Sequence, residues 1–331
     1  MARLSLIALV AVLVPLFANP APGAQMMSDE DLIHMTDSYL DVKDIEGLIE
    51  FADGLHALFD YESLLVVTRH AYDKLPQDQP QLRGFALRGI AESYEGLKQY
   101  DRAITTYRQT IQQHPDSAQA PWCQLGVGRS LIGLGRYDEA ITELRRVVEK
   151  WPNTTAAAWA EEQIGYAYLG QGKPQEALTY IKRALYNYAP EKHPREMGFP
   201  SLKYLRIEIA VPHLHQAYVE AGDDAAALEE FTKLQHVDDV GRTAFYYLAV
   251  HHQRLGQYDH AIDLFTQYIE LPEQFFKRAD AYFNRAMCHF AKGEYDQAIA
   301  GWREVAASFP LHYLAEESVT WIKIAEERKR G

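Results

Sequence analysis

Residues 135–141 read Gly-Arg-Tyr-Asp-Glu-Ala-Ile, and the core of this phrase, Tyr-Asp-x-Ala-Ile, occurs at three further places in the chain. These other copies begin at Tyr100, Tyr258 and Tyr295. The alanines of the phrase and of two weaker copies are spaced by 37 or 34 residues: Ala103, Ala140, Ala177, then Ala227, Ala261 and Ala298. A period of this length is typical of a solenoid of helix pairs. Each copy is therefore predicted to be one pair of helices.

The residues around each alanine indicate a close helix crossing and a turn. A second small residue precedes the alanine by 12 positions in five copies: Ala91, Gly128, Gly165, Ala249 and Ala286. A glycine between the two small residues is placed to end the first helix in a left-handed conformation. It occurs in five copies: Gly135, Gly172, Gly222, Gly256 and Gly293. The aspartate of the phrase is then expected to cap the second helix.

Large side chains and prolines complete the pattern. The large residues follow the alanine by four positions: Tyr107, Leu144, Ile181, Phe231, Phe265 and Trp302. Prolines at Pro115, Pro152 and Pro310 then stop the helix. The whole pattern resembles the tetratricopeptide repeat (TPR) family. This resemblance implies an all-α fold, a right-handed TPR α-solenoid of about seven helix pairs with capping helices.

On the 34-residue TPR frame, the units begin at Ile45, Gly84, Pro121, Ala158, Glu208, Arg242 and Ala279. The longer units of 37 residues are similar in style to bacterial cell-envelope TPR proteins. Two such proteins are the Tol-Pal-associated periplasmic TPR protein and the TPR lipoprotein of the barrel-assembly machine. The period also divides the chain into six segments: a signal peptide (1–24), an N-terminal cap helix (25–44), a four-unit arm (45–190), an irregular insertion (191–207), a three-unit arm (208–310) and a C-terminal capping helix (311–331).

The two ends and the insertion carry their own signals. The apolar run Leu4–Phe17 is shorter than the roughly 20 residues of a membrane span, and small residues follow it, as in a cleaved signal peptide. Ser28 is expected to cap the first helix. In the insertion, Ser201 is expected to cap a helix that Pro212 kinks. We therefore expect a protein that is periplasmic or secreted, without stable membrane insertion after the leader is removed.

Cysteine and histidine residues favour packing over chemistry. Cys123 and Cys288 lie in units far apart, so two buried free thiols are expected even in an oxidising compartment. Histidine pairs such as His213 with His215 lack the i, i+4 spacing of a zinc helix. We predict no metal, no cofactor and no catalytic residue, and hydrogen-bonded histidines in the core. Paired carboxylates such as Glu161 and Glu162 are expected on solvated helix faces.

Charge restricts the class of partner. The chain has 33 basic and 46 acidic residues, a net charge of −13, which disfavours nucleic acid and anionic lipid. We expect an exported scaffold or adaptor that binds a protein or peptide in cell-envelope assembly, division or secretion, and homo-oligomers stay possible. The alternative is an enzyme, or a dedicated enzyme subunit, that uses the histidine-bearing C-terminal arm.

The TPR frame also predicts the binding surface. The resemblance implies an inner wall lined by frame positions 2, 5, 9 and 12 of each first helix, a stripe that follows helical periodicity. The predicted partner-binding groove is Phe85, Arg88, Glu92, Trp122, Leu125, Arg129, Trp159, Glu162, Tyr166, Leu169, Tyr246, Phe283, Met287 and Phe290, with Ile132 beside it. Aromatic and arginine side chains are frequent anchors of protein interfaces. The alternative is that these side chains pack on the preceding unit, above all Trp122 and Trp159.

Overall fold

A computed structural model describes residues 27–41, 44–188, 205–237, 240–271 and 277–330. The predicted signal peptide (1–24) and the Ser201 cap lie outside these residues. The described residues form helices joined by short turns, and no strand occurs among them. The prediction of an all-α solenoid of helix pairs is confirmed. Contacts divide the chain into two compact units, Met1–Leu205 and Arg206–Gly331.

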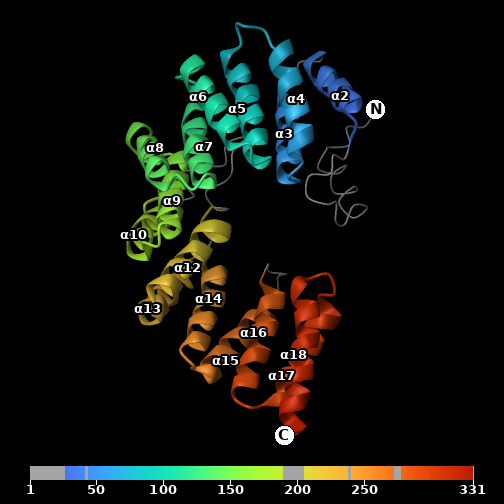
Figure 1. Ribbon diagram of the computed structural model, residues 1–331, viewed down its shortest axis with the longest axis vertical. Coiled ribbons are helices and arrows are strands. Elements are labelled where there is room, and N and C mark those ends of the chain that lie inside the picture. The colour runs from blue at the N-terminus through green and yellow to red at the C-terminus, as the bar shows by residue number, and fades with distance from the viewer. Residues whose placement is uncertain (1–26, 42–43, 189–204, 238–239, 272–276, 331) are drawn as a thin grey trace. The chain divides into compact units, whose positions relative to one another are not determined.

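The first compact unit holds a short cap helix and four helix pairs. The helices are α2 (Asp29–Asp41), α3 (Ile45–Ala57), α4 (Tyr61–Lys74), α5 (Pro80–Gly96), α6 (Tyr100–Gln113), α7 (Ala120–Gly133), α8 (Tyr137–Lys150), α9 (Thr155–Gly170) and α10 (Pro174–Tyr186). From α3 to α10 each helix packs on the next one along the chain. The first helices α5, α7 and α9 also touch one another in succession. In Figure 1 the second helices α6, α8 and α10 follow one another along one side of this row of first helices.

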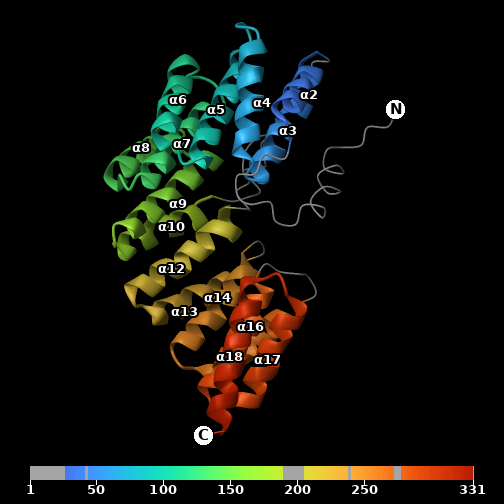
Figure 2. The same cartoon turned by 45° about the vertical axis from the view of Figure 1, so that its right-hand side comes forward.

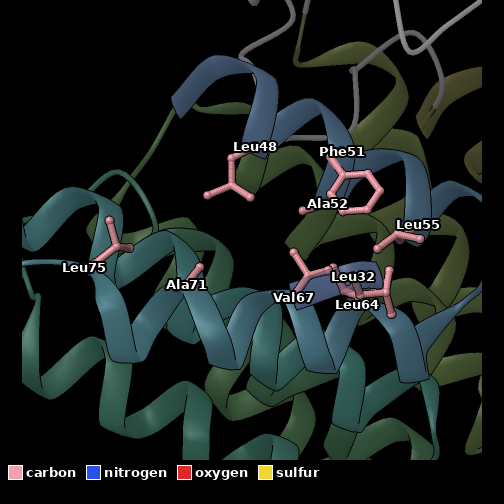
Figure 3. Close-up of a cluster of buried hydrophobic side chains, with 10 residues drawn as sticks. Leu32, Leu48, Phe51, Ala52, Leu55, Leu64, Val67, Ala71 and Leu75 are labelled. Atoms are coloured by element: carbon pink, nitrogen blue, oxygen red, sulfur yellow. The ribbon is translucent and has the colours of Figure 1, made fainter. Parts of the chain in front are cut away.

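The cap helix α2 completes the N-terminal end of this stack. Asp31 donates its backbone N–H to the Ser28 hydroxyl at 3.2 Å, so the predicted cap is confirmed. Leu32 of α2 is fully buried. It meets apolar side chains of α3 and α4 in one cluster that includes Phe51 and Leu64 (Figure 3). The helix therefore covers an apolar face that a terminal pair would otherwise expose.

The turns within the pairs follow the glycine prediction. All five glycines have φ between 68° and 79°, so their left-handed conformation is confirmed. In the first two pairs Phe59 and Lys98 take this conformation instead, with φ of 58° and 59°. The expected aspartate caps of the repeated phrase are wrong. The tyrosine is the first residue of each helix, so an aspartate such as Asp101 lies inside the first turn, and the cap residue before the tyrosine makes no side-chain cap bond.

The close crossings predicted from small residues are present. A Cβ added at Gly128 would lie 2.4 Å from Cγ of Leu144, and one at Gly165 would lie 2.6 Å from Cγ1 of Ile181. Ala140 has no exposed surface. Interiors this dense leave no room for a larger residue at the crossing.

The second compact unit holds three helix pairs and a closing helix. The elements are the π-helix η2 (Leu205–Ala210), α12 (Val211–Ala221), α13 (Asp224–Leu234), α14 (Gly241–Arg254), α15 (Tyr258–Glu270), α16 (Arg278–Ala291), α17 (Tyr295–Ser308) and α18 (Tyr313–Arg330). Pro212 lies in the first turn of α12, directly after the π-helical turn. This placement suits a residue without an N–H donor.

The C-terminal end of this unit is closed by α18, which packs on α17 and α16 (Figure 2). Trp321 of α18 stacks on the buried Trp302 with 5.7 Å between ring centroids. Cys288 of α16, like Cys123 of α7, is a buried free thiol, as the sequence predicts. Burial raises the pKa of both thiols to about 12, so neither is a reactive thiolate.

Candidate functional site

The predicted groove residues divide sharply by their exposure. Eight are buried: Arg88, Trp122, Leu125, Trp159, Glu162, Leu169, Tyr246 and Phe283. Five are half-buried, namely Phe85, Glu92, Arg129, Met287 and Phe290. Only Tyr166 of this set is exposed, with 38% of its surface accessible.

This division follows the frame positions. Position 5 is buried in every unit for which the groove was predicted: Arg88, Leu125, Glu162, Tyr246 and Phe283. Position 9 is accessible in each of its units: Glu92, Arg129, Tyr166 and Met287. Trp122 and Trp159 at position 2 are 7% and 6% exposed. Successive first helices touch, so position 5 and the two tryptophans at position 2 are buried, whereas Phe85 at position 2 is half-buried and position 9 keeps its access to solvent.

A charged cluster connects the first helices of two neighbouring pairs. Arg129 of α7 donates from Nε and Nη2 to the two carboxylate oxygens of Glu95 in α5, at 3.0 and 2.9 Å. Tyr107 of α6 donates its hydroxyl to Glu95 at 2.7 Å. One turn earlier, Arg88 donates to Glu92 at 3.2 Å. A bidentate arginine–carboxylate pair of this kind fixes the orientation of both side chains.

The protonation states of this cluster follow from its surroundings. Burial, and then the neighbouring Glu95 carboxylate, raise the pKa of Tyr107 well above its ordinary value, so its hydroxyl keeps the proton. Burial lowers the pKa of Arg129, but Glu95, Tyr107 and Glu92 together raise it more, and the guanidinium stays charged. Glu95 occupies frame position 12 of its unit and is absent from the predicted groove. That position is the signal that could have found it.

The two adjacent glutamates of α9 correct the sequence analysis. Glu161 is 5% exposed and Glu162 has no exposed surface, so neither lies on the expected solvated face. Gln163 donates an amide hydrogen bond to Glu162 at 2.7 Å. Burial raises the pKa of Glu161. The alanine-rich start of α9 packs tightly, and the helix buries most of its circumference rather than one stripe.

His215 and His251 of the second compact unit form hydrogen bonds, as predicted. His215 Nδ1 lies 3.1 Å from His251 Nε2, and His251 Nδ1 lies 2.6 Å from Asp224 Oδ1. Arg254 donates to the same Asp224 oxygen at 2.8 Å. The His215 ring stacks on Tyr247 with centroids 4.5 Å apart. This stack explains how a histidine replaces glycine or alanine at the crossing of α12.

This histidine array has few of the features of a catalytic or metal site. His251 has no exposed surface, and both of its ring nitrogens are engaged within the protein. Burial lowers the pKa of His215 to about 3, so its ring is neutral. Across the described ranges, no group of three or more metal-ligating side chains has the geometry to hold an ion.

Within the same ranges no helix combines the length and apolar character that crossing a membrane requires.

The stack of helix pairs, with its row of touching first helices, defines an α-solenoid repeat protein. Tetratricopeptide repeat models match residues 85–117, 124–189, 215–274 and 280–312, together more than half of the chain. The chain belongs to the tetratricopeptide repeat family. The matched models describe a repeat and not a catalytic domain.

Several solved structures are similar to this chain. A chain of the Cut9–Hcn1 hetero-tetramer of the APC/C matches with a TM-score of 0.49 and 16% identity over 90% of this chain, which spans about half (52%) of that one. A tetratricopeptide repeat protein from Parabacteroides merdae matches with a TM-score of 0.49 and 14% identity, over 90% of this chain and 98% of its own. The type IV pilus biogenesis factor PilW matches with a TM-score of 0.44 and 21% identity, over 84% and 98%. No curated protein matches the sequence significantly.

Proposed function

We propose that this protein is an exported, periplasmic scaffold or adaptor that holds a protein or peptide partner on the first-helix wall of residues 80–170. Its role belongs to cell-envelope assembly, division or secretion. The leader-like residues 1–24 and the envelope style of the 37-residue units support the location. The repeat family supports the binding role, because such stacks offer extended surfaces for recognition.

The accessible residues at frame position 9 carry this proposal. Tyr166 is the exposed aromatic, and Arg129 keeps 27% of its side chain accessible while Glu95 holds its guanidinium in place. Glu92 provides a half-buried carboxylate on α5. Tyr166 and Arg129 lie on the touching first helices α9 and α7, and aromatic rings and arginines are typical anchors of a protein interface. Because both side chains lie on packed helices, little ordering cost is expected on binding.

Site-specific photocrosslinking tests the wall. A photoreactive phenylalanine replaces Tyr166 of α9 in one strain and Tyr186 of α10 in another, and both proteins are crosslinked in cells. Tyr186 is the matched control because it is an exposed tyrosine, 50% accessible, on a second helix. We expect a discrete crosslinked partner from position 166, identified by mass spectrometry, and not from position 186. Equal yields from both positions would argue against the wall.

Fractionation tests the proposed location independently. The processed protein is expected in the periplasmic fraction, with its N-terminus near Met26. Retention of Met1 together with recovery in the membrane pellet would contradict export with leader cleavage, and would leave the crosslinking result intact.

A further inference from the structure

Frame position 7 of the first helix is a core position in this protein. An aliphatic side chain occupies it in five units and is buried in each: Ile90, Val127, Ile164, Leu214 and Leu248. In the last pair the residue at this position is Arg285 of α16. A cationic side chain thus replaces a core aliphatic residue in one unit of the stack, and the charge has to be compensated there.

The immediate surroundings of Arg285 compensate the charge only in part. Its Nη1 donates to the Thr266 hydroxyl of α15 at 3.2 Å, and the guanidinium lies 5.3 Å from the centre of the Tyr282 ring. The Thr266 hydroxyl itself donates to the Ile262 carbonyl at 2.7 Å. Among the residues that the structure describes, no carboxylate lies within ion-pair distance of Arg285. The guanidinium is half-buried and keeps donors available.

Side chains bridge the corresponding space in two earlier units. In the third unit, Arg108 and Gln124 both donate to Glu143, at 3.1 and 2.8 Å. In the fourth unit, Arg145 donates to the hydroxyls of Tyr168 and Tyr180, at 3.1 Å each. These bridges run from the second helix of one pair to the next pair.

The last pair lacks these bridging side chains. Thr266 occupies the position of Arg108 and Arg145, and Gly301 occupies the position of Glu143 and Tyr180. The space between α15 and α17 is an open cleft of about 550 Å³, lined by Arg285, Thr266, Tyr282, His289, Gly301 and Glu304. This volume lies in the range of small-ligand sites. The cleft lies between the second helices α15 and α17, with residues of the first helix α16 between them, and Met287 at position 9 of α16 is not among its lining residues.

We propose that this cleft binds a carboxylate group, with Arg285 as its anchor. The planar guanidinium matches a carboxylate with two parallel hydrogen bonds. The Tyr282 ring supports the back of the guanidinium. Glu304, which accepts a hydrogen bond from Ser308 at 2.9 Å, adds one negative charge to the cleft. It therefore favours a monoanionic carboxylate over a phosphate dianion. His289 is held by Glu294 at 2.6 Å and forms a wall of the cleft.

Nuclear magnetic resonance of the arginine Nε–Hε groups in the full processed chain tests the proposal. The probes are sodium acetate and the capped tripeptide acetyl-Gly-Glu-Gly-amide, with inorganic phosphate and sodium chloride as references at equal ionic strength. We expect a saturable shift of the Arg285 signal with a carboxylate probe. Arg285→Leu and Arg285→Gln should weaken the binding by at least about ten-fold. Arg303→Leu should leave it unchanged, because Arg303 lies on α17, is exposed and pairs with Glu326 at 3.4 Å.

Thermal melts distinguish a ligand site from a structural role. Arg285→Leu restores the aliphatic residue of the other units, so its Tm without ligand should equal or exceed that of the wild type. A saturable response to acetate identifies a free carboxylate as a sufficient ligand, and a response to the tripeptide alone identifies an acidic side chain of a partner. A shift that chloride or phosphate reproduces overturns the proposal. So does a large fall of Tm in both Arg285 variants.

Discussion

The ring of Tyr100 lies against Gly133, so closely that a Cβ at Gly133 would stand 2.6 Å from Cε1 and Cζ of the ring. Tyr100 opens the second helix of one pair, and Gly133 ends the first helix of the next. The relationship recurs: Tyr61 lies against Gly96, and Tyr137 against Gly170. The tyrosine of the repeated phrase therefore connects successive pairs in the first compact unit.

Replacing Gly133 by alanine tests this contact. The new methyl group displaces the Tyr100 ring, and we expect the free energy of unfolding to fall by about 1–2 kcal/mol through overpacking. The matched control is Gly54→Ala in α3, where no heavy atom lies within 4 Å of the added Cβ. That variant should gain about 0.5–1 kcal/mol from helix propensity. Chemical denaturation monitored by circular dichroism measures both values, and equal effects would refute the contact.

Replacing Phe59 by glycine is expected to stabilise the protein. Phe59 has a φ of 58° and 69% of its surface exposed, at the position where five other units have glycine. A side chain in the left-handed region is strained, and Phe59 buries little surface in return. Phe59→Gly should therefore raise the free energy of unfolding by about 0.5–1 kcal/mol. Denaturant melts provide the measurement.

The control for Phe59 is the opposite exchange at Gly135. Its φ is 72°, and nothing lies within 4 Å of an added Cβ, so only backbone strain acts there. Gly135→Ala should lower the free energy of unfolding by about 1 kcal/mol. If Phe59→Gly instead destabilises the protein, the edge-on contact of Phe59 with Tyr61, at 6.2 Å, outweighs the strain.

Features with a fixed local cause could be predicted from the sequence. The pairs and their crossings follow from residues such as Ala140, and the left-handed turns follow from glycines such as Gly135, because few other residues fit those positions. The aspartate caps could not be read correctly from the phrase alone. Whether Asp101 caps the helix or lies inside it depends on one residue of helix boundary, which local pattern does not fix.

The exposure of the wall depends on packing between units, which spacing alone does not determine. Helical periodicity places positions 2, 5, 9 and 12 on one stripe, but contact between first helices buries Trp159 and leaves Tyr166 exposed. Arg285 was overlooked for a different reason. A comparison of position 7 across the units would have shown it from sequence, whereas the cleft around it depends on Thr266 and Gly301, which belong to other helices.

Two substitutions in α9 should separate core from wall. Trp159 is 6% exposed, so Trp159→Ala should lower the free energy of unfolding by about 3–5 kcal/mol. Tyr166 is 38% exposed, so Tyr166→Ala should cost less than about 1 kcal/mol while partner crosslinking to the wall is lost. Denaturation and photocrosslinking from a neighbouring wall position measure the two effects. A steep loss of stability in Tyr166→Ala would assign that ring to the core.

The hydrogen-bonded chain Asp224–His251–His215 makes the stability of the second compact unit depend on pH. His251 donates from Nδ1 to Asp224, so its Nε2 accepts from Nδ1 of His215 when both rings are neutral. Burial is the largest cause that lowers the pKa of both histidines, to about 3 for His215, and His251 and Arg254 add to the effect on His215. Asp224 acts in the opposite direction on both rings. Tyr247 covers the His215 ring, and Lys277 adds a further positive charge nearby.

Acidification should therefore loosen α12–α14. In the unfolded chain the histidines protonate below about pH 6.5, whereas the folded rings stay neutral, so unfolding takes up protons. The stabilisation is complete above pH 6.5 and is lost as the pH falls toward the folded pKa of about 3 for His215. The loss is at most about 1.4 kcal/mol per pH unit for each histidine.

Hydrogen exchange of α12–α14 at pH 7.5 and pH 5, corrected for intrinsic rates, should show faster opening at pH 5, with α7–α9 as the internal reference. His215→Phe keeps a ring on Tyr247 but cannot protonate, so its exchange should depend less on pH. An equal pH dependence in the wild type and His215→Phe would exclude His215 as the cause.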